Sequence, residues 1–160
     1  PLQNYSLRSV IASDVELLFH WANDPDVRGS SINKKPITWE DHCKWFYNGL
    51  HNPNRLHLLL EDSSHCPIGQ VRFDRHTDSL CVVISFSIDS VFRGYGVSEK
   101  MLRLAFYKLS SHWSDDLVLV ADVYPANKAS MAIFSKLGFT LSEEPNSNAT
   151  VRWSLSSPFV

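Results

Sequence analysis

The sequence lacks the features that would place it in several specialised classes of protein. No apolar run approaches the roughly 20 residues that a membrane-spanning helix requires. Lys and Arg form no block, and 15 basic residues against 17 acidic ones give a net charge of −2. We therefore expect neither nucleic acid nor a membrane as a partner. The first residues do not resemble a signal peptide, and a cytoplasmic location is the expectation.

Cysteine and metal-ligand patterns are also sparse. The three cysteines, Cys43, Cys66 and Cys81, are irregularly spaced and form no disulfide framework, which fits a reducing compartment. Cys43 follows His42 directly, but adjacent helix residues point in different directions, so a nucleophilic Cys–His pair is a poor alternative. The seven histidines have no metal-ligand spacing. We expect no metal.

The composition and the order of elements indicate one globular α/β domain over residues 1–160. Hydrophobic residues make up 44% of the chain and charged residues 20%, which is ordinary for a protein with a buried core. A capping box at Ser13–Glu16 predicts a helix start, and the polar stretch 26–35 predicts a loop. A mixed sheet with helices on its faces suits this order. Strands are expected at 5–10, 56–61, 68–74, 80–88, 117–123, 139–143 and 150–155, and helices at 13–23, 38–49, 97–112 and 128–137.

The segment 91–102 carries the most information about function. A buried strand, 80–88, is followed by the turn Arg93-Gly94-Tyr95-Gly96 and then by a helix. Two glycines let the backbone bend tightly and approach a ligand, and the N–H groups of a helix N-terminus attract phosphate. The turn predicts a pyrophosphate-bearing ligand, although many Gly-x-Gly turns are only turns. The third glycine of a dinucleotide motif and the Gly-Lys-Ser/Thr of a nucleoside-triphosphate loop are both absent.

A second segment, 123–139, makes the pattern more specific. Arg93-x-x-Gly-x-Ser98 after a strand, with Asn127-x-x-Ser130 before a helix that ends Lys-x-Gly-Phe139, resembles the GNAT acyl-CoA N-acetyltransferases. Ser98 stands where that family usually has Gly or Ala. The resemblance implies a GNAT fold: a mixed, mostly antiparallel central sheet with helices on both faces. It also implies that two central parallel strands splay apart and that the acetyl thioester lies between them.

The resemblance implies acetyl-CoA as cosubstrate and assigns residues to it. Backbone N–H groups of the strand end at 86–88 would stabilise the developing oxyanion and pair with the pantetheine arm, while the side chains there fit a buried core equally well. Asn127 is expected to contact the coenzyme, to cap its helix, or both. Ser130 is either a coenzyme contact or a small packing residue. The expected coenzyme-binding residues are Phe86, Ser87, Ile88, Arg93, Gly94, Tyr95, Gly96, Val97, Ser98, Asn127 and Ser130.

The proton chemistry departs from the family pattern at Phe134. Many GNAT enzymes carry in this helix a Tyr that protonates the departing thiolate, and a phenylalanine ring has no donor. The candidate catalytic residues are Asp122, Tyr124 and Asn127, with Asp89 as a further ionisable group. Either carboxylate could instead be simply solvated. A water relay or a non-catalytic acyl-CoA-binding domain is also compatible with Phe134.

The N-terminal half is expected to select the acceptor. Its short segments at 21–28, 37–46 and 68–74 resemble the GNAT enzymes that acetylate the 4-amino group of nucleotide-linked dideoxy amino sugars in pseudaminic and legionaminic acid pathways. The tryptophans there fit helix cores as well as a ligand face. A protein N-terminus, a polyamine or an antibiotic are the alternative acceptors, and a homodimer stays open. The expected acceptor contacts are Asn23, Arg28, His42, Gln70, Arg72 and Asp74.

Overall fold

The computed structural model describes residues 4–77, 79–113, 116–142 and 146–159. Parts of the predicted turns around Asp78 and Pro145 lie outside these residues. The remaining element predictions agree with the structure to within a few residues, apart from two N-terminal ones described below. The strands are β1 (Ser6–Ser9), β2 (Arg55–Glu61), β3 (Pro67–Arg75), β4 (Cys81–Ile88), β5 (Val118–Val123), β6 (Thr140–Leu141) and β7 (Val151–Ser156). The helices are α1 (Val15–Ala22), α2 (Pro25–Gly29), α3 (Trp39–Leu50), α4 (Val97–His112) and α5 (Lys128–Lys136), with short 3-10 turns η1 (Ala12–Asp14) and η2 (Ser90–Phe92).

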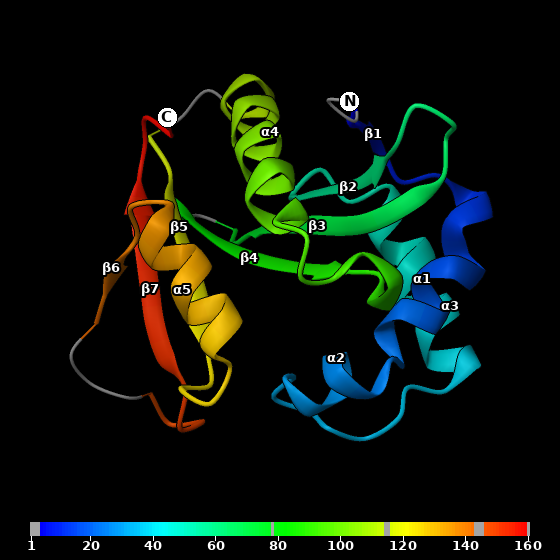
Figure 1. Ribbon diagram of the computed structural model, residues 1–160, viewed down its shortest axis with the longest axis horizontal. Helices are drawn as coiled ribbons and strands as arrows, with labels where there is room; N and C mark the ends of the chain where they lie inside the picture. Colours follow the sequence, from blue (N-terminus) through cyan, green and yellow to red (C-terminus); the bar gives the residue numbers. More distant parts are fainter. Residues whose placement is uncertain (1–3, 78, 114–115, 143–145, 160) are drawn as a thin grey trace.

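Within the described ranges, seven strands form one mixed sheet in the order β1-β2-β3-β4-β5-β7-β6. Every neighbouring pair is antiparallel except β4 and β5, which run parallel at the centre (Figure 1). That parallel pairing covers only residues 81–83 against 118–120. Beyond it, β4 continues to pair with β3 as far as Ile88, and β5 continues to pair with β7 as far as Val123. The predicted splay between the two central parallel strands is therefore present.

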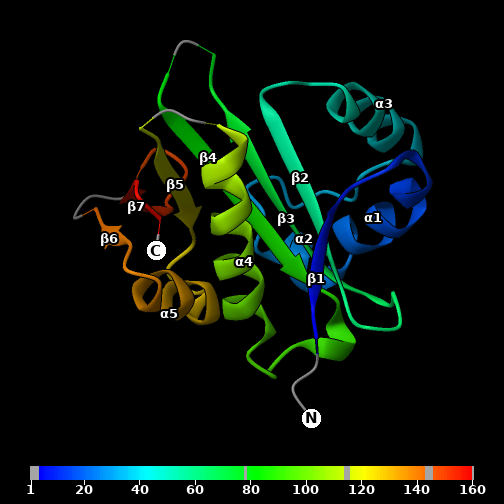
Figure 2. The same ribbon diagram turned by 90° about the horizontal axis from the view of Figure 1, so that it is seen from above.

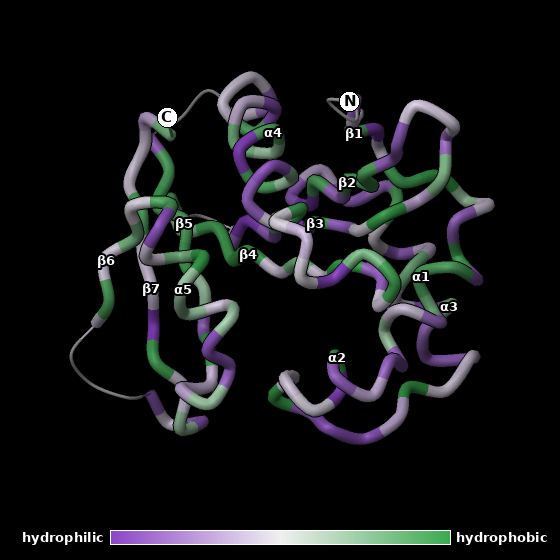
Figure 3. Tube along the Cα trace, viewed as in Figure 1, coloured by the Kyte–Doolittle hydropathy of each residue, from purple (hydrophilic) through white to green (hydrophobic). Residues whose placement is uncertain are grey.

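Helices cover both faces of the sheet. Alternate residues of a strand point to opposite faces, and on β2 Leu58 and Leu60 belong to a large core with α4 and α5, while Leu59 belongs to a smaller core with α1 and α3. Figures 1 and 2 show α4 against the middle of the sheet, α1 and α3 at the β1–β2 end, and α5 at the β5–β7 end. In Figure 3 the α2 segment and the loop after it are largely hydrophilic. We call the sheet face that carries α1 and α3 the acceptor face.

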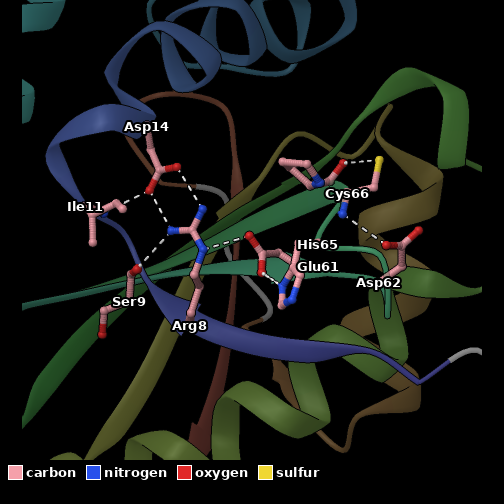
Figure 4. Close-up of polar contacts among 9 residues, drawn as sticks. Arg8, Ser9, Ile11, Asp14, Glu61, Asp62, His65 and Cys66 are labelled. Atoms are coloured by element: carbon pink, nitrogen blue, oxygen red, sulfur yellow. Dashed lines mark hydrogen bonds and ion pairs between the residues drawn. The ribbon is translucent and has the colours of Figure 1, made fainter.

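One arginine on β1 ties β1, η1 and β2 together (Figure 4). Arg8 donates from both Nη atoms to the Asp14 carboxylate at 2.7 and 2.9 Å, and from Nε to Glu61 Oε1 at 2.7 Å. Asp14 and Glu61 are 6% and 7% exposed, so one guanidinium pairs with two buried carboxylates. Hydrogen bonding and charge attraction from Arg8 keep the pKa of both carboxyls below the usual range despite their burial. This network fixes where α1 begins.

Two predictions for the N-terminal region are wrong. The start of α1 is not a Ser13–Glu16 capping box, because Asp14 Oδ2 accepts the Ile11 N–H at 2.8 Å and holds a 3-10 turn before the helix. The stretch 26–35 is not entirely a loop, since α2 occupies its first residues. Asp24 caps α2 by accepting from the Asp26 and Val27 amides, and Pro25 suits the first helical position.

Candidate active site

The splay leaves backbone groups of β4 without a neighbour on one side. Residues 84–88 pair with β3 on one edge, and no residue of β5 pairs with the other edge. The missing ladder exposes backbone hydrogen-bonding groups to an extended ligand, as an unpaired sheet edge does. Phe86 and Ile88 pack into the core that contains α4, so Ser85 and Ser87 point to the acceptor face. The strand thus offers its backbone to a coenzyme arm and two hydroxyl groups to an acceptor.

The turn after β4 has the conformation that anion binding requires. Gly94 and Gly96 have φ values of 84° and 72°, in the left-handed region that favours glycine, and Gly96 is the N-cap of α4. In the described part of the chain the amides of Gly94, Tyr95 and Gly96 donate to no other group. They are joined by the free N–H groups of the first turn of α4, which begins at Val97 and continues through Ser98. A pyrophosphate can be bound there by backbone donors alone.

Arg93 braces this turn against the N-terminal half. Its Nε donates to the Ile88 carbonyl at 2.9 Å, and its two Nη atoms contact Asp24 at 3.0 Å and Asp26 at 2.8 Å. Asp89 fixes the same corner, because it accepts from the Trp21 indole N–H at 2.8 Å and from the Val91 amide at 3.0 Å. In this arrangement Arg93 joins the end of β4 to α2, and a phosphate has to share the guanidinium with two carboxylates.

The end of β5 carries two of the predicted catalytic residues. Asp122 lies opposite Arg152 of β7 and is held by two hydrogen bonds of 2.9 Å. These bonds lower the pKa of the Asp122 carboxyl, which makes it a poor proton acceptor. Lys34, from the loop between α2 and α3, lies 5.1 Å from the centre of the Tyr124 ring. That contact links the loop to the strand end across the splay.

Helix α5 begins at the predicted asparagine. Asn127 Oδ1 accepts the Ser130 amide at 3.2 Å, and the Asn127 amide donates to the Tyr124 carbonyl at 2.8 Å. Asn127 therefore has the capping role, and Ser130 lies in the first turn of the helix. Phe134 is 2% exposed and packs edge-on against Phe86 of β4 at 5.8 Å between ring centres. The helix thus presents an apolar ring, with no proton donor, to the strand that borders the splay.

A charged and aromatic cluster covers the acceptor face of β2 and β3. Asp74 accepts from Arg55 Nε and from Arg72 Nε, each at 2.6 Å. The two guanidiniums lie 4.6 and 4.8 Å from the Trp45 ring of α3. Two cations share one carboxylate, so the cluster has a net positive charge. In the described residues the two Nη atoms of Arg72 donate to no protein group, and the side chain is 23% exposed.

A chain of hydrogen bonds runs across the same face from β2 to β4. His57 Nε2 contacts Gln70 Oε1 at 2.7 Å, and Gln70 Nε2 donates to Ser87 Oγ at 3.1 Å. Burial lowers the pKa of His57 to about 4, with the Arg72 and Arg55 charges adding to the effect. His57 also borders a cavity of about 130 Å³ under α3, which is lined by Trp45 and Arg55 but by no residue of β4 or β5.

The remaining predicted acceptor residues hold the N-terminal helices. Asn23 bonds the amide and carbonyl of Ile37 at 2.8 and 3.1 Å. Arg28 donates to the carbonyls of Ala22 and Asn33 and to Ser31 Oγ. His42 is 2% exposed and contacts the Val15 carbonyl at 2.8 Å. The structure thus gathers Gln70, Arg72 and Asp74 on one face and places these three residues in the scaffold.

Sequence reasoning missed four residues that border the site. Arg55 and His57 alternate on β2 and lie on the same face as the predicted β3 residues. The alternation of polar and apolar residues over 55–59 could therefore have marked both as facing the same side. Lys34 and Arg152 come from a loop and from a strand far along the chain, and no local pattern marks them. In the described residues no group of three or more His, Cys, Asp or Glu side chains is placed to hold a metal, and no helix is long and apolar enough to cross a membrane.

Comparison with known proteins identifies the fold. Over 75 residues, 46% of the chain, it is 28% identical to an uncharacterised protein of Methanocaldococcus jannaschii. The match spans only 16% of that relative's length. A solved domain from the same organism superposes with a TM-score of 0.82 at 19% identity, covering 97% of this chain and 99% of that one. Spermidine N-acetyltransferase from Vibrio cholerae, solved with CoA and spermine, also gives 0.82 at 12% identity, covering 96% and 94%.

The family follows from the sequence match. Residues 5–140 match the family model described as an acetyltransferase (GNAT) domain. The sheet order, the splay and the solved relatives agree with it. These findings give no support to the finer resemblance to amino-sugar enzymes of pseudaminic and legionaminic acid pathways. The chain belongs to the GNAT acetyltransferase domain family, the family of acetyl-CoA-dependent N-acetyltransferases.

Proposed function

We propose that this domain transfers the acetyl group of acetyl-CoA to the primary amine of a small acceptor that also carries a negative charge. The observation that supports the use of acetyl-CoA is the splay with its turn: an unpaired edge of β4 leads into free amides at the N-terminus of α4. The pantetheine arm would pair with β4, and the pyrophosphate would lie on the amides of 94–98. The acetyl carbonyl would then face backbone N–H groups of 86–88.

The positive charge of the acceptor face supports an acceptor that carries a negative charge. The amine has to approach from the face that carries Ser85 and Ser87, because Phe86 and Ile88 fill the other face. Arg72 lies opposite Ser85 on the neighbouring strand. In the described residues its Nη atoms donate to no protein group, and Asp74 balances the charge of only one of the two guanidiniums. A planar guanidinium with open donors suits a carboxylate or a phosphate.

A nucleotide-linked 4-amino sugar is one acceptor of this class, since its diphosphate could contact Arg72 while its amine reaches the thioester. Arg28 adds nothing to this proposal, because its donors are committed to Ala22, Ser31 and Asn33. The Vibrio cholerae relative was solved with spermine, which carries positive charge, but at 12% identity that likeness bears on the fold alone. Polycations would meet the surplus cation on the acceptor face.

The experiment is free-thiol release from acetyl-CoA with matched amines. 4-Aminobutyrate and 4-aminobutyramide differ only in the charge of one end, and a UDP-linked 4-amino-4,6-dideoxy sugar and spermidine complete the set. We expect the carboxylate to be preferred over its amide by about tenfold or more, the worth of one charge-assisted hydrogen bond. Arg72→Gln should remove that preference, and hydroxylamine, which has no anionic group, should react equally well with both proteins.

Each result has a definite meaning. Preference for spermidine would overturn the anionic acceptor and leave the acetyl transfer. Preference for the sugar nucleotide would identify the acceptor within the proposed class. Tight acetyl-CoA binding without thiol release with any amine, hydroxylamine included, would favour the alternative of a non-catalytic acyl-CoA-binding domain.

A further inference from the structure

The Ser87 hydroxyl, at the edge of the splay, accepts a hydrogen bond but donates none among the described residues. Its oxygen accepts from Gln70 Nε2 at 3.1 Å, so its own proton points elsewhere. In the described part of the chain that proton has no acceptor, and the side chain is only partly buried. The β4 segment that carries it has no β5 partner. One lone pair and one proton of Ser87 are therefore available on the acceptor face.

The orientation of Gln70 is fixed from the other side. Its Oε1 accepts from His57 Nε2 at 2.7 Å, which turns its amino group toward Ser87. An amide oxygen can only accept, so with Gln70 Oε1 toward His57 the neutral imidazole carries its one hydrogen on Nε2. The His57 ring is partly buried and lies edge-on to the Trp45 ring at 6.2 Å between ring centres, which keeps it in place. His57 and Gln70 are thus positioning residues that set the direction of the Ser87 hydroxyl.

We propose that Ser87 carries the proton of the attacking amine to the sulfur of the departing coenzyme, with Gln70 and His57 holding its hydroxyl in the required direction. The inference rests on the proposed function, since it concerns the same acetyl transfer. It assigns a role to the side chain of Ser87, in addition to the backbone role that the family resemblance implies.

The step balances without a further reactant. A neutral amine attacks the thioester carbonyl and forms a tetrahedral intermediate with a positively charged nitrogen and an oxyanion. As the carbon–sulfur bond breaks, an N–H bond breaks and its proton goes to Ser87 Oγ, while the original Ser87 proton goes to the sulfur. The products are the amide, the free thiol of coenzyme A and an unchanged serine. The remaining Oγ lone pair stays bonded to Gln70 throughout.

The other groups around the splay are less suited to this task. Phe134 has no donor and is buried against Phe86. Asp122 is held as a carboxylate by Arg152, so it has no proton to give. Tyr124 lies under the Lys34 ammonium at the end of β5 and is the remaining candidate donor. A Ser87 relay therefore competes with Tyr124, and a variant of each distinguishes them.

The test uses acetyl-CoA with hydroxylamine, a small nucleophile that needs no anion site. Ser87→Ala should lower kcat by about 10²-fold, the lower end for a lost general acid–base group, with the KM for acetyl-CoA changed by less than about threefold. Ser111→Ala is the control, because Ser111 is an exposed serine near the end of α4 whose Oγ donates to the Tyr107 carbonyl of the same helix, away from the splay. It should leave kcat within about twofold. Gln70→Met should give a smaller loss than Ser87→Ala.

A second donor separates proton transfer from packing. In the acetyl selenoester of coenzyme A the leaving selenolate needs no proton, because selenols are stronger acids than thiols. The Ser87→Ala defect should then shrink to within about threefold of wild type, and a merely structural defect would persist with both donors. If the wild type is active and Ser87→Ala loses no activity, the Ser87 relay is wrong while the proposed function stands. The same conclusion follows if Tyr124→Phe, and not Ser87→Ala, loses the activity. A wild type that binds acetyl-CoA and transfers nothing would overturn the proposed function and the relay together.

Discussion

Single arginines connect elements that are distant in the sequence. Arg8 joins β1 to η1 and β2, Arg93 joins the end of β4 to α2, and Arg152 joins β7 to β5. Each guanidinium distributes its donors over two or more acceptors, which a lysine could not do with the same geometry. The consequences of removing them differ, because the carboxylates that they leave behind differ in burial.

Removal of Arg8 should destabilise the whole protein. Arg8→Met leaves the buried carboxylates of Asp14 and Glu61 without their cation, and we expect a loss of about 2–4 kcal/mol in the free energy of unfolding. Lys44→Ala is the control, because the Lys44–Glu40 pair is mostly exposed and its loss should fall within about 0.5 kcal/mol. Urea denaturation measures both. Equal, small losses would show that the Arg8 network contributes little.

Arg93 should affect the coenzyme more than stability. Arg93→Glu places a third carboxylate beside Asp24 and Asp26 and releases the Ile88 carbonyl, at the corner from which the turn begins. We expect acetyl-CoA affinity to fall by about tenfold or more. Lys108→Glu, a charge reversal at an exposed position of α4, is the control. Titration calorimetry would detect the difference, and unchanged affinity would remove the pyrophosphate turn from the site.

Residue types alone did not separate site from scaffold. Arg28 and Arg72 look equivalent in the sequence. In the structure Arg28 donates to the carbonyls of Ala22 and Asn33, whereas in the described residues the Nη atoms of Arg72 donate to no protein group. The difference arises from α2, a five-residue helix whose short length gives no periodic signal. His42 likewise has the polarity of a ligand contact, but the amphipathic pattern of α3 turns it into the core with Phe46.

At the scale of elements, the turn between β4 and α4 is the part that the sequence describes best. Its glycines, the preceding apolar strand and the following helix were all predicted within one residue, because each rests on local backbone preference. The start of α1 was mispredicted for the opposite reason. A serine with a glutamate three residues later is a local signal, and the tertiary bonds of Asp14 to Arg8 outweigh it.

Alanine at the glycines of the turn tests its conformation without changing any contact. A Cβ at Gly94 or Gly96 would meet nothing within 4 Å, so the cost is the positive φ alone, about 1–2 kcal/mol each. We expect Gly96→Ala to destabilise the protein by that amount and to weaken acetyl-CoA binding. Gly29→Ala on α2 is equally uncrowded but lacks the positive φ, and it should be neutral or slightly stabilising. Similar thermal shifts for both variants would contradict the assigned turn.

At the scale of the molecule, the two faces of the sheet divide its contacts differently. One face carries the large core with α4 and α5, and the acceptor face carries the smaller core with α1 and α3 together with a cluster of ionisable groups between β2, β3 and α3. The alternation on β3 showed that Gln70, Arg72 and Asp74 share a face, but a stripe facing a ligand and one facing solvent look alike in a sequence. The alternation on β2 puts Arg55 and His57 on one face, and the pairing of β2 with β3 shows that this is the face of Gln70, Arg72 and Asp74.

This division predicts how stability depends on pH. His57 faces Arg55, Arg72, Asp74 and Asp14, and its pKa is lowered from 6.5 to about 4 in the folded protein. The unfolded chain therefore binds a proton that the folded one does not, and stability should fall by about 3 kcal/mol as the pH drops from 6.5 to 4. His57→Gln keeps a donor toward Gln70 but cannot titrate, so its stability curve should be flatter in that window. Parallel curves for the two proteins would contradict a buried neutral His57.

Amide hydrogen exchange with and without acetyl-CoA tests most directly whether the coenzyme binds at the splay. The proposed coenzyme site runs along the unpaired edge of β4 and over the turn that follows. Acetyl-CoA should therefore slow exchange in peptides that cover 84–98, with a smaller effect near 124–131 at the start of α5. Peptides that cover β1 and β2 should change little. Bound acetyl-CoA that leaves 84–98 unprotected, or that protects β1 and β2 instead, would contradict a coenzyme site at the splay.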